Sequence, residues 1–131
     1  MWADRYVGLP FRAAALGQPG FRCGDLVRKV LAEQFGVVLV DSAPVRGVEA
    51  YLARLKANGD WRSVPAPQPG DVLLMTTPVG HGEAAPLHVG IMATPTHVLH
   101  VDEGRLSTCD SVASPSIRHR MAGFYRHRCL A

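Results

Sequence analysis

The sequence predicts an α+β fold in which helices are packed on an antiparallel β-sheet. Two observations lead to this prediction. Apolar residues recur at helical spacing in the first half of the chain, and short apolar runs with strand-like alternation fill the second half. Helices followed by strands are typical of the α+β class. A length of 131 residues fits one domain, which is expected to cover residues 1–131.

The first half predicts three helices. A short one is expected over residues 1–8, and a glycine-rich loop, AAALGQPGFR, follows it. The next helix is expected to begin at Cys23 and to stop at Gly36, because glycine favours the left-handed conformation just beyond helix C-termini. After a short extended candidate, VVLVD, a further helix is expected from Val45 to about Ala57, with apolar residues on one face.

The second half predicts short strands. The proline-rich segment SVPAPQPGD is expected to be an extended connector. The strand candidates are short apolar runs separated by Gly, Pro, Thr and Ser: DVLLM, LHVGIMA, HVLHVD, RLSTCDSV and RMAGFYR. Asp71, at the entrance of the first run, is expected to have a structural role.

Composition excludes several classes of protein. Hydrophobic residues make up 47% and charged residues 19%, which fits a globular chain and not a disordered one. The net charge of +3 comes with scattered arginines and a C-terminal basic cluster that is expected to be solvated, so no nucleic-acid partner is expected. No apolar run is long enough for a membrane span, and no signal peptide is recognisable, so synthesis in the cytoplasm is expected. The three cysteines lack regular spacing, which argues against a disulfide framework.

Cys23 is the first candidate functional residue. It opens a stripe of apolar residues at the i, i+3, i+4, i+7, i+8 spacing of a core-facing helix: Cys23, Leu26, Val27, Val30 and Leu31. One interpretation is a small buried hydrophobe, since free cysteine is often buried. The other is a thiolate nucleophile stabilised by the positive end of the helix dipole. This stretch alone leaves both open.

Histidine is the usual base for a nucleophilic cysteine, and the chain has six. Three of them, at positions 81, 119 and 127, are expected to be exposed. The others lie in the predicted hairpin LHVGIMATPTHVLHVD. A three-residue loop would place His88 and His100 on one face, directly opposite or diagonal to each other, with His97 on the other face. A four-residue loop would separate His88 from His100.

These segments together resemble the NlpC-type cell-wall peptidases, especially a branch that phages encode in their tail modules. The resemblance rests on the order and spacing of RCGDLVRKV, PGDVLLM, HVGIM, VLHVD and GFYR. It extends over nearly the whole chain, from YVGLPF to GFYR.

The resemblance implies a papain-like α+β fold whose antiparallel sheet can form a partly open barrel. It implies a cysteine peptidase that hydrolyses the peptide stems of peptidoglycan, typically at the D-glutamyl to diamino-acid bond. The catalytic residues would be Cys23 as nucleophile, His88 as base and His100 as the group that orients His88, with no cofactor and no metal. The expected partners are the stem peptide and phage tail-tip proteins, and the expected location is the virion tail, acting at the bacterial cell wall.

Two departures from the family pattern bear on activity. Gly24 and Asp25 follow Cys23, where the family commonly has one residue and then glycine. The Asp25 carboxylate suits a helix N-terminus but opposes a nearby thiolate, whereas Arg22 favours it. Phe11 stands where the family often has tyrosine, whose hydroxyl can help an oxyanion hole, so the backbone N–H of Cys23 becomes the principal expected donor.

Three alternatives remain at this point. One is a structural tail-tip protein that keeps the fold without the chemistry, because a fold does not determine function. A second is a zinc enzyme, since His88, His97, His100 and Cys109 lie close in sequence, although they match neither HExxH nor paired CxxC spacing. A third is an acyltransferase or amidase that uses cysteine and histidine on the same fold.

Overall fold

The structure is a computed structural model that describes residues 1–10, 23–38, 59–76, 87–102 and 104–130. The elements in these ranges are η1 (Trp2–Tyr6), α1 (Cys23–Phe35), β1 (Trp61–Val64), β2 (Val72–Thr76), β3 (Leu87–Thr94), β4 (His97–His100), β5 (Thr108–Ser111), α3 (Pro115–Arg118) and β6 (Met121–His127). The six strands form one antiparallel sheet in the order β1-β6-β2-β3-β4-β5. The sheet is open, with β1 and β5 at its edges, and the predicted α+β class is confirmed.

The helix predicted to begin at Cys23 is present as α1. It ends at Phe35, and Gly36 follows with a φ of 68°, the left-handed conformation that glycine adopts without a steric penalty. The N–H of Val37 then donates to the Leu31 carbonyl, which closes the last turn. The predicted N-terminal helix is present as the 3-10 helix η1.

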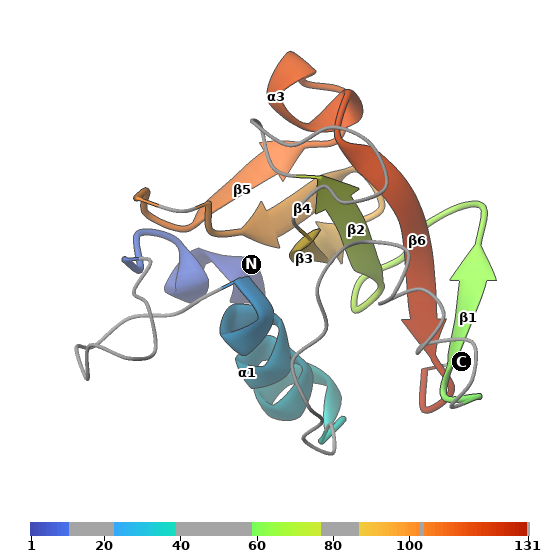
Figure 1. Ribbon diagram of the computed structural model, residues 1–131. Coiled ribbons are helices and arrows are strands. Elements are labelled where there is room, and N and C mark those ends of the chain that lie inside the picture. Colours follow the sequence, from blue (N-terminus) through green and yellow to red (C-terminus); the bar gives the residue numbers. More distant parts are fainter. Residues whose placement is uncertain (11–22, 39–58, 77–86, 103, 131) are drawn as a thin grey trace.

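Two apolar cores cover the two faces of the sheet. Figure 1 shows α1 below the sheet and α3 above it in this view. The larger core joins α1 to the sheet and includes Leu26, Val30, Leu31, Val72, Leu74, Val89, Ile91 and Leu99. The smaller core lies on the other face of the sheet. It contains strand residues that alternate with those of the larger core, together with Ile117 of α3: Leu73, Met75, Met92, Val98 and Ile117. Strands buried on both faces read as continuous apolar runs, which explains sequences such as VLLM.

Some elements differ from the sequence-based expectations. Residues 63 and 64, assigned to the connector, end strand β1, which has no apolar alternation of its own and exists because it pairs with β6. The four-residue helix α3 was not expected. Val37 and Val38 lie outside regular structure, and the rest of VVLVD is outside the described residues. The expected helix at 45–57, the glycine-rich loop, Phe11 and His81 also lie outside them.

Asp71 immediately precedes β2 and is fully buried. The Arg126 guanidinium donates to both of its carboxylate oxygens, with both distances 2.8 Å, and the N–H of Gln68 donates to Oδ2 at 2.9 Å. A bidentate arginine holds a buried carboxylate in one orientation. The pair therefore fixes the start of β2 against β6, in line with the structural role expected for Asp71.

No helix in the described ranges is long and apolar enough to cross a membrane.

Candidate active site

The β3–β4 hairpin places the two candidate histidines on one face. Its register pairs Ile91 with Leu99 and Met92 with Val98, and it shifts by one residue before Thr94 meets His97. The turn consists of residues 95 and 96, shorter than the predicted three-residue loop. The irregularity beside the turn compensates for the missing residue, so the register beyond it keeps the predicted parity.

Gly90 lets the histidines of the two strands approach. A Cβ atom at this position would lie 2.5 Å from Val98 Cγ2 and 3.1 Å from His100 Cβ. Real Cβ atoms do not approach side chains to 2.5 Å, so any larger residue would push Val98 or His100 away. The close packing of β3 against β4 therefore explains why glycine occurs at this position of HVGIM.

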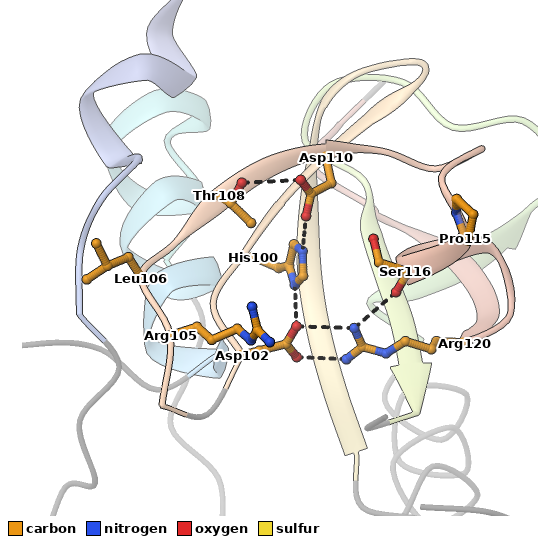
Figure 2. A pocket seen from close by; sticks show the side chains of 9 residues that line it. All are labelled: His100, Asp102, Arg105, Leu106, Thr108, Asp110, Pro115, Ser116 and Arg120. Carbon is orange, nitrogen blue, oxygen red and sulfur yellow. Dashed lines mark hydrogen bonds and ion pairs between the residues drawn. The ribbon is translucent and has the colours of Figure 1, made fainter. Parts of the chain in front are cut away.

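His88 and His100 are in direct contact. His88 Nε2 and His100 Nδ1 lie 2.9 Å apart, and the rings meet edge to face with centroids 5.2 Å apart. Both side chains are buried, with 4% and 2% of their surface exposed. The other nitrogen of His100, Nε2, lies 2.9 Å from Oδ2 of Asp110 on β5 (Figure 2). Asp110 on β5 therefore fixes the orientation of the His100 ring, and through it the arrangement of the pair.

A second carboxylate, Asp102, borders the pair. Its Oδ1 lies 3.3 Å from His88 Nε2, and its Oδ2 lies 3.7 Å from His100 Nδ1. Arg120 donates to both oxygens of Asp102, at 3.2 and 2.7 Å, and also to the carbonyl oxygens of Thr76 and Ser116. Figure 2 shows this guanidinium reaching across from the end of α3 to Asp102. Arg120 thus ties the end of β2, α3 and the segment after β4 into one unit.

The sequence predicted that the basic cluster near the C-terminus would be exposed to solvent, and this prediction is wrong at three positions. Arg120 is buried and paired with Asp102, and Arg126 is paired with Asp71. His127, which was expected to be exposed, is buried beside Trp61. Arg126 and His127 belong to β6, which lies inside the sheet between β1 and β2, and Arg120 directly precedes this strand. His119 is exposed as expected.

The electrostatic environment keeps His88 neutral at pH 7. Burial lowers its pKa to about 4, and the positive charge of Arg120 and the neighbouring His100 act in the same direction, while Asp102 opposes them. For Asp102, burial opposes ionisation, but the hydrogen bonds from Arg120 and the charge interactions with His88, Arg120 and His100 outweigh it and lower the pKa of that carboxyl. A neutral histidine next to an ionised aspartate can act as a general base.

The same cluster offers ligand atoms for a metal ion. Nitrogens of His88 and His100 and an oxygen of Asp102 all lie within 4.8 Å of one another. However, the Arg120 guanidinium is bound to the same carboxylate, and its charge would repel a divalent cation there. The zinc set considered from the sequence is not assembled: His97 contacts Thr94 and Thr96 at the hairpin turn, and Cys109 pairs with Leu99. The geometry favours a hydrogen-bonded histidine pair.

Cys23 is the first residue of α1, and its side chain lies outside the described part of the structure. The apolar stripe that it was expected to open is buried at its four remaining positions. Those positions pack on Val89, Ile91 and Leu99, on the opposite face of the hairpin from His88. The remaining residues of the stripe therefore pack α1 on the face of the hairpin opposite His88.

Acid is expected to destabilise the protein through His88. The unfolded chain binds a proton at His88 near pH 6.5 and the folded chain only near pH 4, so the unfolded state binds more protons in between. The free energy of unfolding should therefore fall as the pH drops from about 6.5 to about 4, by roughly 3 kcal/mol at most. Urea unfolding of the wild type and of His88→Gln across this range measures the effect. Equal pH slopes in the two proteins would contradict the assignment.

A family model described as the NlpC/P60 family matches residues 8–126. The search of curated proteins found no match.

Proposed function

Because the chain belongs to the NlpC/P60 family, whose members are generally cysteine peptidases that hydrolyse peptidoglycan, we propose that it is a cysteine endopeptidase of the bacterial cell wall. The observation that carries the proposal is the buried contact between His88 and His100. In the proposal Cys23 is the nucleophile, His88 the base and His100 the residue that orients the base.

The start of α1 supports a nucleophilic role for Cys23. The first N–H groups of a helix lack partners within the helix, and the helix dipole places positive charge there. Both effects favour a thiolate and stabilise the oxyanion that forms when the thiolate attacks a peptide carbonyl. The backbone N–H of Cys23 is the principal donor in this proposal.

The reaction then follows from the protonation states. Neutral His88 takes the thiol proton through Nδ1, since its Nε2 is occupied by His100. The Cys23 sulfur attacks the carbonyl of the stem peptide, and the protonated His88 gives its proton to the leaving amine. Water, activated by His88, hydrolyses the acyl-enzyme and regenerates the thiol.

The proposal requires Cys23 to meet His88 at one end of β3. α1 packs on β3 from the face opposite His88. His88 is the second residue of β3, so its ring lies at the end of the strand. In the proposal, Cys23 reaches His88 around this end of the strand.

The finer parts of the proposal come from the sequence. The resemblance to the branch encoded in phage tail modules supports a virion tail location, with tail-tip proteins as neighbours and entry or assembly as the setting. It also supports the D-glutamyl to diamino-acid bond as the bond cleaved.

Digestion of purified peptidoglycan tests the proposal. The wild-type protein should release fragments with a new amino terminus on the diamino acid, identified by mass analysis, and Cys23→Ser should release none. A different fragment pattern would replace the proposed bond with another. Intact peptidoglycan after incubation with folded wild-type protein would contradict the enzyme and favour a structural role in the tail.

A further inference from the structure

We propose that Asp110 is a positioning residue that acts on the base through His100. The inference rests on the proposed function and extends the site by one strand, from β4 to β5. Asp110 Oδ2 lies 2.9 Å from His100 Nε2, and Asp110 Oδ1 accepts a hydrogen bond from the Thr108 hydroxyl at 3.2 Å. Figure 2 shows Asp110 and Asp102 on opposite sides of the His100 ring.

The sheet brings Asp110 to this place. β4 and β5 pair His100 with Thr108 and Val98 with Asp110. Asp110 is therefore the diagonal neighbour of His100 on the same face, a spacing that a long or aromatic side chain can bridge. The relation repeats the one between His88 and His100 on the preceding strand pair, so three adjacent strands each contribute one polar side chain to a continuous row.

The Asp110 carboxylate, at the end of this row, determines which nitrogens of His100 and His88 donate hydrogen bonds and which accept them. An ionised carboxylate only accepts hydrogen bonds, so His100 Nε2 must carry the hydrogen in its contact with Asp110. A neutral imidazole has one N–H, which leaves His100 Nδ1 as an acceptor for the Nε2–H of His88. His88 Nδ1 is then left with a lone pair, and this is the nitrogen that the mechanism needs as a base. Asp110 thus selects the productive tautomer of a residue that it does not contact.

Asp102 does not replace Asp110 in this role. Its oxygens are farther from the histidine nitrogens, at 3.3 and 3.7 Å, and its charge is shared with Arg120. Its contact with His88 Nε2 favours the same hydrogen position on His88, but it does not fix the tautomer of His100. The outer side of Asp110 is exposed to solvent, because its side chain is 32% exposed and lines a pocket of about 780 Å³ that also borders His100. Water there can solvate the outer side of the carboxylate while the inner oxygen holds His100.

The test compares Asp110→Asn with Asp110→Glu, and with Asp60→Asn as a matched control. Asp60 is an exposed carboxylate paired with Arg128, so its loss reports the effect of removing one charge elsewhere. The side-chain amide of asparagine can offer an N–H to His100 Nε2 and so permit the wrong tautomer. We expect kcat to fall at least tenfold in Asp110→Asn with KM unchanged, part of the loss to be restored in Asp110→Glu, and melting temperatures to match that of Asp60→Asn.

Nitrogen-15 spectra of the histidine rings provide a readout that does not depend on turnover. The wild type should show hydrogen on Nε2 of both His88 and His100, and Asp110→Asn should show a mixture at His100. An active wild type whose Asp110→Asn variant keeps both its kcat and a single tautomer overturns this inference and leaves the proposed function intact. An inactive wild type overturns the proposed function, whereas the spectra still decide whether Asp110 orients the pair.

Discussion

Replacing His88 with alanine is expected to abolish turnover, whereas replacing His100 with alanine should leave a measurable remnant. Removal of His88 eliminates the base for the thiol and the acid for the leaving amine, and such a group contributes up to about 10⁴-fold to the rate. Removal of His100 leaves the base in place and removes its principal orienting contact. We expect a loss of about ten- to a hundredfold in kcat for His100→Ala, a smaller effect because the base itself remains.

The structure gives a reason for the remnant in His100→Ala. Asp102 Oδ1 already lies 3.3 Å from His88 Nε2, so a second acceptor remains when His100 is removed. It can hold the same hydrogen position on His88, although less firmly, because Arg120 occupies the same oxygen at 2.7 Å. The double variant His100→Ala/Asp102→Asn should therefore lose more activity than the product of the two single losses predicts.

His97→Ala is the matched control for these variants. His97 belongs to the same strand as His100, but its ring contacts Thr94 and Thr96 at the turn. Hydrolysis of peptidoglycan fragments under saturating conditions measures all the variants, and circular dichroism checks that each is folded. A silent His100→Ala would reduce the site to a Cys23–His88 dyad. A fully active His88→Ala would exclude His88 as the base.

The two strands of the hairpin could be predicted from the sequence, because the residues that indicate them lie close together in the chain. Alternation along HVGIM and VLHVD assigns the faces of each strand, but the parity of the register also depends on the irregularity beside the two-residue turn. The contact between His88 and His100 was therefore one of two outcomes that the sequence left open, and the structure shows which one occurs. The helix beginning at Cys23 could be predicted for the same reason, since its apolar spacing and Gly36 are local signals.

The partners of the histidine pair could not be predicted in this way. Asp110 and Arg120 reach the site through strand neighbours and a turn whose positions depend on the whole sheet. Asp102 could have been found, because alternation places it on the face of His100. Arg120, in contrast, stands among arginines and a histidine that look like a solvated basic tail. Only the position of β6 inside the sheet shows that several of them are buried.

The sequence also could not predict which face of the hairpin α1 covers. The stripe of α1 predicts that one side of the helix is buried, but the hairpin is apolar on both faces. Periodicity cannot choose between two apolar faces. The choice is made by the remaining strands and by α3, which contributes Ile117 to the second core.

Asp71→Ala is expected to be strongly destabilising, with a loss of about 3–5 kcal/mol. Asp71 has no exposed surface, and its partner Arg126 keeps only 13% of its side-chain surface exposed. Alanine at position 71 would leave a guanidinium desolvated without its carboxylate, and the N–H of Gln68 would lose its acceptor. A domain of this size has only about 5–15 kcal/mol of stability, so the variant will lie close to unfolding.

The exposed pair between Arg128 and Asp60 provides the comparison. Its two side chains are 70% and 43% exposed at a separation of 2.9 Å, so Asp60→Ala should cost at most about 1 kcal/mol. Urea unfolding measures both losses, and Asp71→Asn serves as a second variant that keeps the shape and one acceptor if Asp71→Ala does not fold. Equal losses for Asp71→Ala and Asp60→Ala would show that the buried pair is not what holds β2 to β6. Since β2 also pairs with β3 beside His88, a destabilised Asp71 variant should lose activity in proportion to the unfolded fraction, and its kcat per folded molecule should stay unchanged.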